Sequence, residues 1–247
     1  ATGREVVSEL LASPAWEQVT VVVRRKIDRW ENLPEDQAKK LNITYCEDFG
    51  QLSDLSKWQM PGFDSVFCCL GTQSTKYGKK IFYQVDHDYT MHTAMIAQAS
   101  KIPHYSIISS TGANHKSFAY YPKIKGQTEN EIIALKLPIT SIHRPGLLLH
   151  RDNDSRFMEK VAAWIPFFPK IESRDVGRVA RIEAEMRHNS TLSEGLNSKL
   201  KLKNKGSEGA AVYFYENSDM LNLLRAKLQN DISLDALVPL SPLIFSE

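Results

Sequence analysis

A tyrosine and a lysine four residues apart are the first candidates for chemistry in this sequence. Tyr121 and Lys125 open a predicted helix, and a spacing of four places both side chains on one face of it. A lysine ammonium near a phenol favours the phenolate and lowers the pKa of the tyrosine, which then exchanges protons near neutral pH. The same spacing also occurs by chance on solvated helices. Tyr121 is therefore a candidate proton donor, and Lys125 the group that tunes it.

A serine eleven residues before the tyrosine is the third candidate. Ser109 and Ser110 end the predicted strand His104–Ile108, and open α/β sheets bind ligands at the carboxyl ends of their strands. The Ser110 hydroxyl would hydrogen-bond a substrate carbonyl while Tyr121 protonates it. The alternative is a Ser-Ser-Thr-Gly turn without chemistry. The serine, tyrosine and lysine together favour the catalytic interpretation.

Strand-like and helix-like segments alternate along the chain and would position these side chains. Val19–Val23 is a β-branched run, which is typical of a buried parallel strand. The alternation predicts an α/β fold, a doubly wound parallel sheet with helices on both faces. The other predicted strands are 42–46, 64–70, 104–108, 139–143 and 211–215, and the predicted helices are 81–99, 121–135, 155–164, 174–187 and 218–227.

Two segments suit a dinucleotide. Arg24 and Arg25 follow Val19–Val23, where a dinucleotide fold meets the adenosine ribose. A basic pair suits a 2′-phosphate, so NADPH (NADP) is preferred over NADH, unless the arginines are only surface residues. Ala1-Thr2-Gly3 runs into a helical segment and is similar to the end of a glycine-rich phosphate loop. The strand and glycines that precede such a loop are absent, so we expect an upstream segment to supply this central, first strand.

Composition limits the class of protein. The chain has 247 residues, 42% of them hydrophobic, and a net charge of +2, which suits one buried domain and does not favour nucleic acid. Three cysteines without a CxxC or HExxH pattern predict neither a disulfide framework nor a metal site. No apolar run reaches the roughly 18 residues of a membrane span. We expect a cytoplasmic protein, with the nucleus as the alternative.

The chain is less regular after Gly146. We expect a single domain over residues 1–228, interrupted at about 190–209 by a mobile surface insertion that is rich in Ser, Lys, Asn and Gly. An irregular C-terminal tail is expected at 229–247, where Pro239 and Pro242 interrupt the pattern.

Several motifs occur together in one order. The sequence resembles the short-chain dehydrogenase/reductase superfamily, and within it the atypical group of the Tat-interacting protein, over about residues 1–187. The resemblance implies a Rossmann-like NAD(P)-binding domain. Asp86 and Asp88 are expected to complement a helix start rather than to hold a metal. The shared motifs are Cys-Leu-Gly-Thr at 69–72, Val-Asp-x-Asp-Tyr at 85–89, Ser-Ser-x-Gly-Ala at 109–113, Tyr-x-x-x-Lys-Gly at 121–126 and Arg-Pro-Gly-Leu-Leu at 144–148.

The resemblance also implies a role for each matching residue. Tyr121 and Lys125 would hold the nicotinamide ribose and serve the chemistry. The other cofactor-binding residues would line the nucleotide from its diphosphate and 2′-phosphate, past its adenine, to its nicotinamide end: Ala1, Thr2, Gly3, Arg24, Arg25, Asp48, Leu70, Gly71, Leu148 and Arg156.

Three functions fit these residues. In the leading hypothesis, NADPH reduces a small carbonyl substrate by hydride transfer, Tyr121 protonates the oxygen, Lys125 tunes Tyr121 and Ser110 orients the substrate. The alternative is a regulatory protein that senses NADPH and contacts a protein partner with little turnover, since the resembled group is linked to such partners. The fold does not decide between them. A sugar-nucleotide epimerase or dehydratase ranks third, because the region after Gly146 is small for a nucleotide sugar.

Overall fold

The structure is a computed structural model of the whole chain. The predicted helix at 155–164 and part of the predicted insertion at 190–209 lie outside the residues that it describes. Those residues are 2–72, 74–149, 169–189, 194–195, 197–198, 200, 204–207, 209–228 and 239–246.

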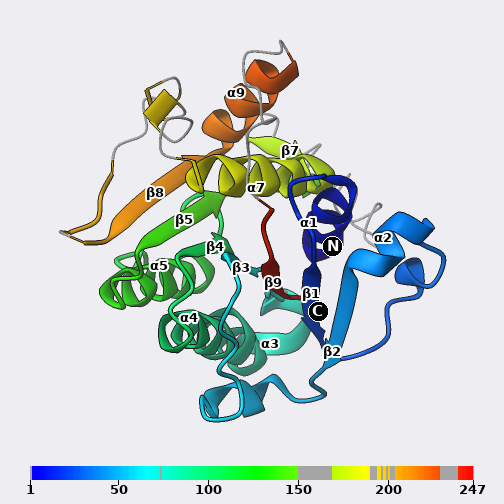
Figure 1. Cartoon of the computed structure of the whole chain (residues 1–247). Coiled ribbons are helices and arrows are strands. Elements are labelled where there is room, and N and C mark those ends of the chain that lie inside the picture. The colour runs from blue at the N-terminus through cyan, green and yellow to red at the C-terminus, as the bar shows by residue number, and fades with distance from the viewer. Residues whose placement is uncertain are drawn as a thin grey trace.

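A seven-stranded parallel sheet forms the centre of the molecule, in the order β2-β1-β9-β3-β4-β5-β8 (Figure 1). This confirms the predicted doubly wound parallel sheet. A separate parallel pair joins β6 (Leu147–Leu149) to β7 (Lys170–Glu172). The strands of the large sheet are β1 (Val19–Val23), β2 (Leu41–Tyr45), β3 (Ser65–Cys68), β4 (His104–Ile108), β5 (Ile139–Arg144), β8 (Ala211–Glu216) and β9 (Pro242–Phe245).

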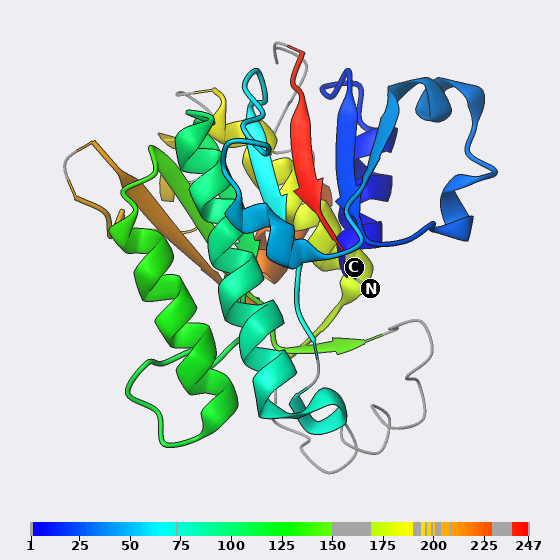
Figure 2. The same cartoon turned by 90° about the horizontal axis from the view of Figure 1, so that it is seen from below.

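Helices cover both faces of the sheet (Figures 1 and 2). One face carries α1 (Thr2–Ala12), α7 (Ser173–Arg187) and α9 (Asn217–Leu228). The other carries α3 (Ser74–Tyr83), the π-helical turn η3 (Gln84–Tyr89), α4 (Thr90–Ala99) and α5 (Tyr120–Ala134). Three short helical elements lie around the first two strands. η1 (Asp28–Trp30) follows β1, α2 (Glu35–Lys40) precedes β2, and η2 (Phe49–Ser53) follows β2.

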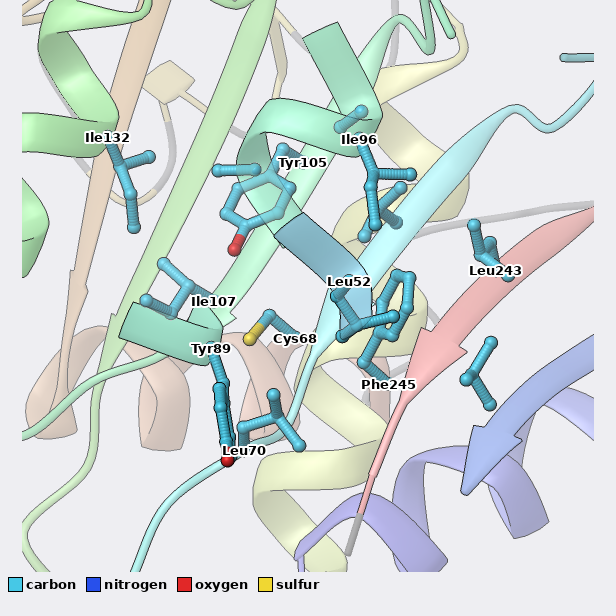
Figure 3. Close-up of a cluster of buried hydrophobic side chains, with 14 of the residues drawn as sticks. Leu52, Cys68, Leu70, Tyr89, Ile96, Tyr105, Ile107, Ile132, Leu243 and Phe245 are labelled. Carbon is cyan, nitrogen blue, oxygen red and sulfur yellow. The ribbon is translucent and has the colours of Figure 1, made fainter. Parts of the chain in front are cut away.

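A buried hydrophobic cluster fixes α4 and α5 to the sheet (Figure 3). Tyr105 of β4, Ile96 of α4 and Ile132 of α5 are fully buried in it, together with Leu243 and Phe245 of β9. Burial of one such side chain contributes roughly 1.5–3 kcal/mol. Strand β9 is therefore a structural part of the core.

Strand β9 occupies the sheet position for which we expected an upstream segment. It lies between β1 and β3 and is parallel to both. Our prediction of an irregular tail at 229–247 is wrong for residues 242–245. An apolar run of four residues that begins at Pro242 carries little strand signal, because proline removes a backbone donor and is tolerated only at the first position. Leu240 also bonds the chain ahead of β1, since its amide lies 2.8 Å from the Ala15 carbonyl oxygen.

Candidate functional site

The predicted site residues follow the carboxyl ends of neighbouring parallel strands. Arg24 follows β1, Gly71 follows β3 and Ser110 follows β4, so all three lie toward the same edge of the sheet. From β1 the chain continues outward to β2, whereas from β3 it continues to β4 and β5 on the opposite side. Open α/β sheets bind ligands in the crevice at such a reversal of strand order.

Tyr121 and Lys125 lie in the first turns of α5, as predicted. Tyr121 is 39% exposed, whereas Lys125 is buried. The ring of Tyr121 packs against Phe82 of α3, with 5.2 Å between the ring centroids. One helical face thus presents an accessible phenol with a buried ammonium one turn further along.

Lys125 forms a buried ion pair with Asp86. The Lys125 Nζ lies 2.7 Å from Asp86 Oδ1, and the second carboxylate oxygen accepts the Thr72 amide at 2.8 Å. Burial by itself would lower the pKa of the Lys125 ammonium. The charges of Asp86 and of the nearby Tyr121 oxygen outweigh burial and raise that pKa above its usual value. Lys125 is therefore a cation throughout the physiological range.

Asp86 is the site residue that sequence reasoning assigned wrongly. We expected it to complement a helix start, but it lies in η3, which continues α3 into α4, and it is 1% exposed. A carboxylate at this depth needs a cation or several hydrogen bonds. The available signal was an acid inside the apolar helical segment predicted at 81–99, which implies a buried partner.

Gly71 lies directly against this ion pair. A Cβ at Gly71 would be 3.4 Å from Asp86 Oδ1 and 4.0 Å from Lys125 Nζ. Gly71 is itself exposed, whereas the preceding Leu70 is buried in the core. Only the backbone of Gly71 therefore separates the ion pair from solvent. The absence of a side chain there would let a flat cofactor approach the pair closely.

The two serines after β4 have different surroundings. The Ser109 hydroxyl is buried and donates to Glu129, whose carboxylate also accepts two hydrogen bonds from Arg144. Ser110 is half-buried, and its hydroxyl makes a 3.3 Å contact with the Thr111 carbonyl oxygen. Of the two, Ser110 is the one whose hydroxyl is available to a ligand.

The segment after Ser110 is fixed against the start of α5. The Asn114 amide donates to the Pro122 carbonyl at 2.9 Å. A Cβ on Gly126 would lie only 2.3 Å from the backbone nitrogen of His115. The absence of a side chain at Gly126 thus lets the loop that carries Ser110 contact the helix that carries Tyr121.

Basic residues follow β1 and lie beside the beginning of α1. Arg24 and Arg25 are both exposed, and the Arg24 guanidinium lies 5.9 Å from the centroid of the Phe49 ring. Arg25 lines a surface pocket together with basic side chains from α1 and from the residues that follow β1. The lining residues are Arg4, Arg25, Lys26, Ile27, Asp28 and Arg29.

The other predicted contacts have different surroundings. Thr2 and Gly3 begin α1 and are buried. The Asp48 carboxylate accepts hydrogen bonds from the Gly50 amide at 2.8 Å and from the Tyr89 hydroxyl at 3.3 Å. Leu148 is buried on β6 among other apolar side chains. Ala1 and Arg156 lie outside the described residues.

Comparisons with known proteins agree with this architecture. Residues 1–181 match a family described as NAD(P)H-binding. Protein HTATIP2 of Rattus norvegicus is 34% identical over 155 residues, which are 63% of this chain and 62% of the relative, so the match spans less than two thirds of the rat protein. Protein fmp52, mitochondrial, of Emericella nidulans is 32% identical over 162 residues, which are 65% of this chain and 68% of the relative.

The fold also matches solved structures. MoeE5 in complex with UDP-glucose and NAD superposes with a TM-score of 0.60 at 11% identity, covering 99% of this chain and 85% of that chain. Identity this low shows the fold alone. The sheet order and the switch point at its carboxyl edge define a Rossmann-type dinucleotide-binding protein. The chain belongs to the NAD(P)H-binding family, among the atypical short-chain dehydrogenases/reductases that resemble the Tat-interacting protein, which confirms the resemblance read from its motifs.

Proposed function

We propose that this protein binds NADP(H) at the carboxyl edge of its sheet and reduces a carbonyl compound there, with Tyr121 as the proton donor. The observation that carries the proposal is the arrangement on α5, where the accessible Tyr121 shares a helical face with the buried Lys125 cation. The exposed backbone of Gly71 lies next to that cation. A cofactor and a substrate would thus meet beside a phenol and an ammonium.

Each residue would have a defined task. NADPH, when bound, would supply the hydride that reduces the carbonyl. Tyr121 would give its proton to the carbonyl oxygen, and Ser110 would hold that oxygen by a hydrogen bond. Lys125 would donate to the nicotinamide ribose and stabilise the phenolate left on Tyr121.

The basic residues after β1 support the phosphorylated cofactor. The pocket beside Arg25 is lined by four cationic side chains and a single acid, Asp28. Arginine binds phosphate through several donors at once, which suits a ribose 2′-phosphate. We therefore assign the 2′-phosphate to Arg24 and Arg25.

The ion pair also favours a second candidate function, an NADPH-sensing regulatory protein with little turnover. Asp86 offsets the charge of Lys125 at 2.7 Å. A lysine whose charge is offset by a carboxylate stabilises a neighbouring phenolate less than an unpaired lysine does. Tyr121 would then be a slow proton donor, and binding of the nucleotide would be the main event.

Turnover measurements separate these functions. Wild-type protein is assayed by loss of NADPH absorbance with a panel of aldehydes, ketones and quinones, beside Tyr121→Phe and Tyr120→Phe. Tyr120 is a matched control, since its hydroxyl donates to the Lys79 carbonyl at 3.1 Å on the surface. The proposal predicts that only Tyr121→Phe loses about 100-fold or more in kcat. Equal turnover in all three proteins contradicts it, and NADPH binding without turnover on any carbonyl favours the regulatory function.

Two observations bear on the cellular location of the protein. In the described part of the chain, no helix is long and apolar enough to cross a membrane. The relative from Emericella nidulans is named as mitochondrial. The expected cytoplasmic location stays a prediction, which imaging of a tagged full-length protein beside a mitochondrial marker would test.

A further inference from the structure

Strand β9 ends at the point where the dinucleotide fold holds phosphate. In register, Phe245 is the partner of Val22 on β1 and of Cys68 on β3. The next residue, Ser246, donates its amide to the Val22 carbonyl at 3.2 Å, and the Phe245 carbonyl accepts the Cys69 amide at 3.0 Å. Ser246 is thereby fixed at the carboxyl end of the central strand, between the ends of β1 and β3.

Ser246 faces the first turn of α1. A Cβ on Gly3 would lie 2.1 Å from Ser246 Oγ and 2.8 Å from Ser246 Cβ, so only glycine fits at this position. Ser246 is 3% exposed. Among the described residues its hydroxyl has no hydrogen-bond partner, although its amide is bonded. A hydroxyl without a partner, on a side chain that is otherwise buried, is a group that a ligand can satisfy.

The charge at this point suits an anion. Helix α1 has eleven residues, and the amides of its first turn have no acceptor within the helix. The helix dipole adds a partial positive charge there. Glu5, the acid of that turn, is paired with Arg29 at 2.6 Å, so its charge is offset. Arg24 and Arg25 follow the adjacent strand.

We propose that Ser246 is a cofactor-binding residue, whose hydroxyl donates to the diphosphate of the nicotinamide nucleotide at the beginning of α1. The inference rests on the proposed cofactor and adds a residue far in sequence from every predicted contact. The phosphate site then consists of Thr2 and Gly3 from one part of the chain and Ser246 from another. Because Ser246 directly follows the central strand, bound nucleotide would stabilise the docking of β9.

Two variants of equal size test the role of Ser246. Ser246→Asp places a negative charge beside the diphosphate, whereas Ser246→Asn has the same shape without the charge. Both are titrated by calorimetry with NADPH and with 2′-AMP, which carries the adenosine and the 2′-phosphate but no diphosphate. We expect Ser246→Asp to bind NADPH at least about tenfold more weakly than Ser246→Asn, with equal affinity of both for 2′-AMP.

Equal NADPH affinity of the two variants overturns the inference while leaving the proposed cofactor intact. Wild-type protein that binds neither nucleotide overturns both. If circular dichroism shows that the larger side chains prevent folding, Ser246→Ala replaces them. Its NADPH dissociation constant should rise about tenfold, by loss of a hydrogen bond to a charged group, and an unchanged constant overturns the inference.

Discussion

The ammonium of Lys125 and the carboxylate of Asp86 lie 2.7 Å apart beneath the exposed backbone of Gly71. Both side chains are buried, so the electrostatic character of the candidate site depends on a pair rather than on a single lysine. The pair holds Lys125 in place and offsets the charge of its ammonium. The structural consequence of the pair can be measured directly.

Asp86→Asn should destabilise the protein because it leaves Lys125 buried without a counterion. Removal of one member of a buried pair costs about 3–5 kcal/mol, and the retained amide of asparagine favours the lower end of that range. Urea unfolding measures the change. Asp86→Asn combined with Lys125→Met should recover part of the loss, since no uncompensated charge remains. A loss below about 1 kcal/mol for Asp86→Asn would contradict the buried pair.

His143 should make the protein lose stability in mild acid. Burial lowers the pKa of His143 to about 4, although the charge of Glu183 opposes this effect. The unfolded chain takes up a proton below about pH 6.5, whereas the folded chain does so only near pH 4. Stability is therefore complete above pH 6.5 and declines between pH 6.5 and 4. A pKa difference of about 2.5 corresponds to about 3 kcal/mol.

Substitution of His143 isolates this contribution. His143 Nε2 lies 3.1 Å from Ser106 Oγ, and a glutamine side chain can keep a hydrogen bond there without titrating. His143→Gln should have a shallower decline in unfolding free energy between pH 6.5 and 4 than the wild type. The exposed His115 provides the control, and His115→Gln should leave the slope unchanged. Equal slopes in all three proteins would count against the assignment to His143.

Gly126→Ala should displace the loop that carries Ser110. The new Cβ would lie 2.3 Å from His115 nitrogen and 2.5 Å from a backbone carbon of Asn114, and backbone cannot move aside cheaply. We expect a loss of roughly 1–3 kcal/mol in unfolding free energy. At Gly195 a Cβ meets open space, so Gly195→Ala should change stability by less than about 0.5 kcal/mol. Similar losses at both positions would contradict the close approach of loop and helix.

The fold could be predicted largely from β-branched and apolar runs. Val19–Val23 and His104–Ile108 are buried along their whole length, and such strands have the continuous hydrophobic pattern of a parallel sheet. Strand β9 was not predicted, because a run of four residues that begins with proline gives almost no local sequence signal for a strand. Its position is determined by long-range pairing with β1 and β3, which periodicity does not report.

The site was predictable where a motif has fixed spacing within one element. Tyr121 and Lys125 are such a pair, and the structure places them on one helix as expected. Asp86 and Ser246 come from other elements, and their significance depends on contacts with Lys125 and Gly3 across the fold. An acid in an apolar helix indicates a buried partner but does not identify it.

Cofactor preference tests the central claim most directly. Wild-type protein, Arg24→Ala and Arg225→Ala are titrated with NADPH and NADH under the same salt conditions. Arg225 is an exposed arginine on α9 and controls for the general loss of a positive charge. We expect the wild type and Arg225→Ala to bind NADPH at least about tenfold more tightly than NADH, and Arg24→Ala to lose that preference. Failure of the wild type to bind either nucleotide would contradict the account.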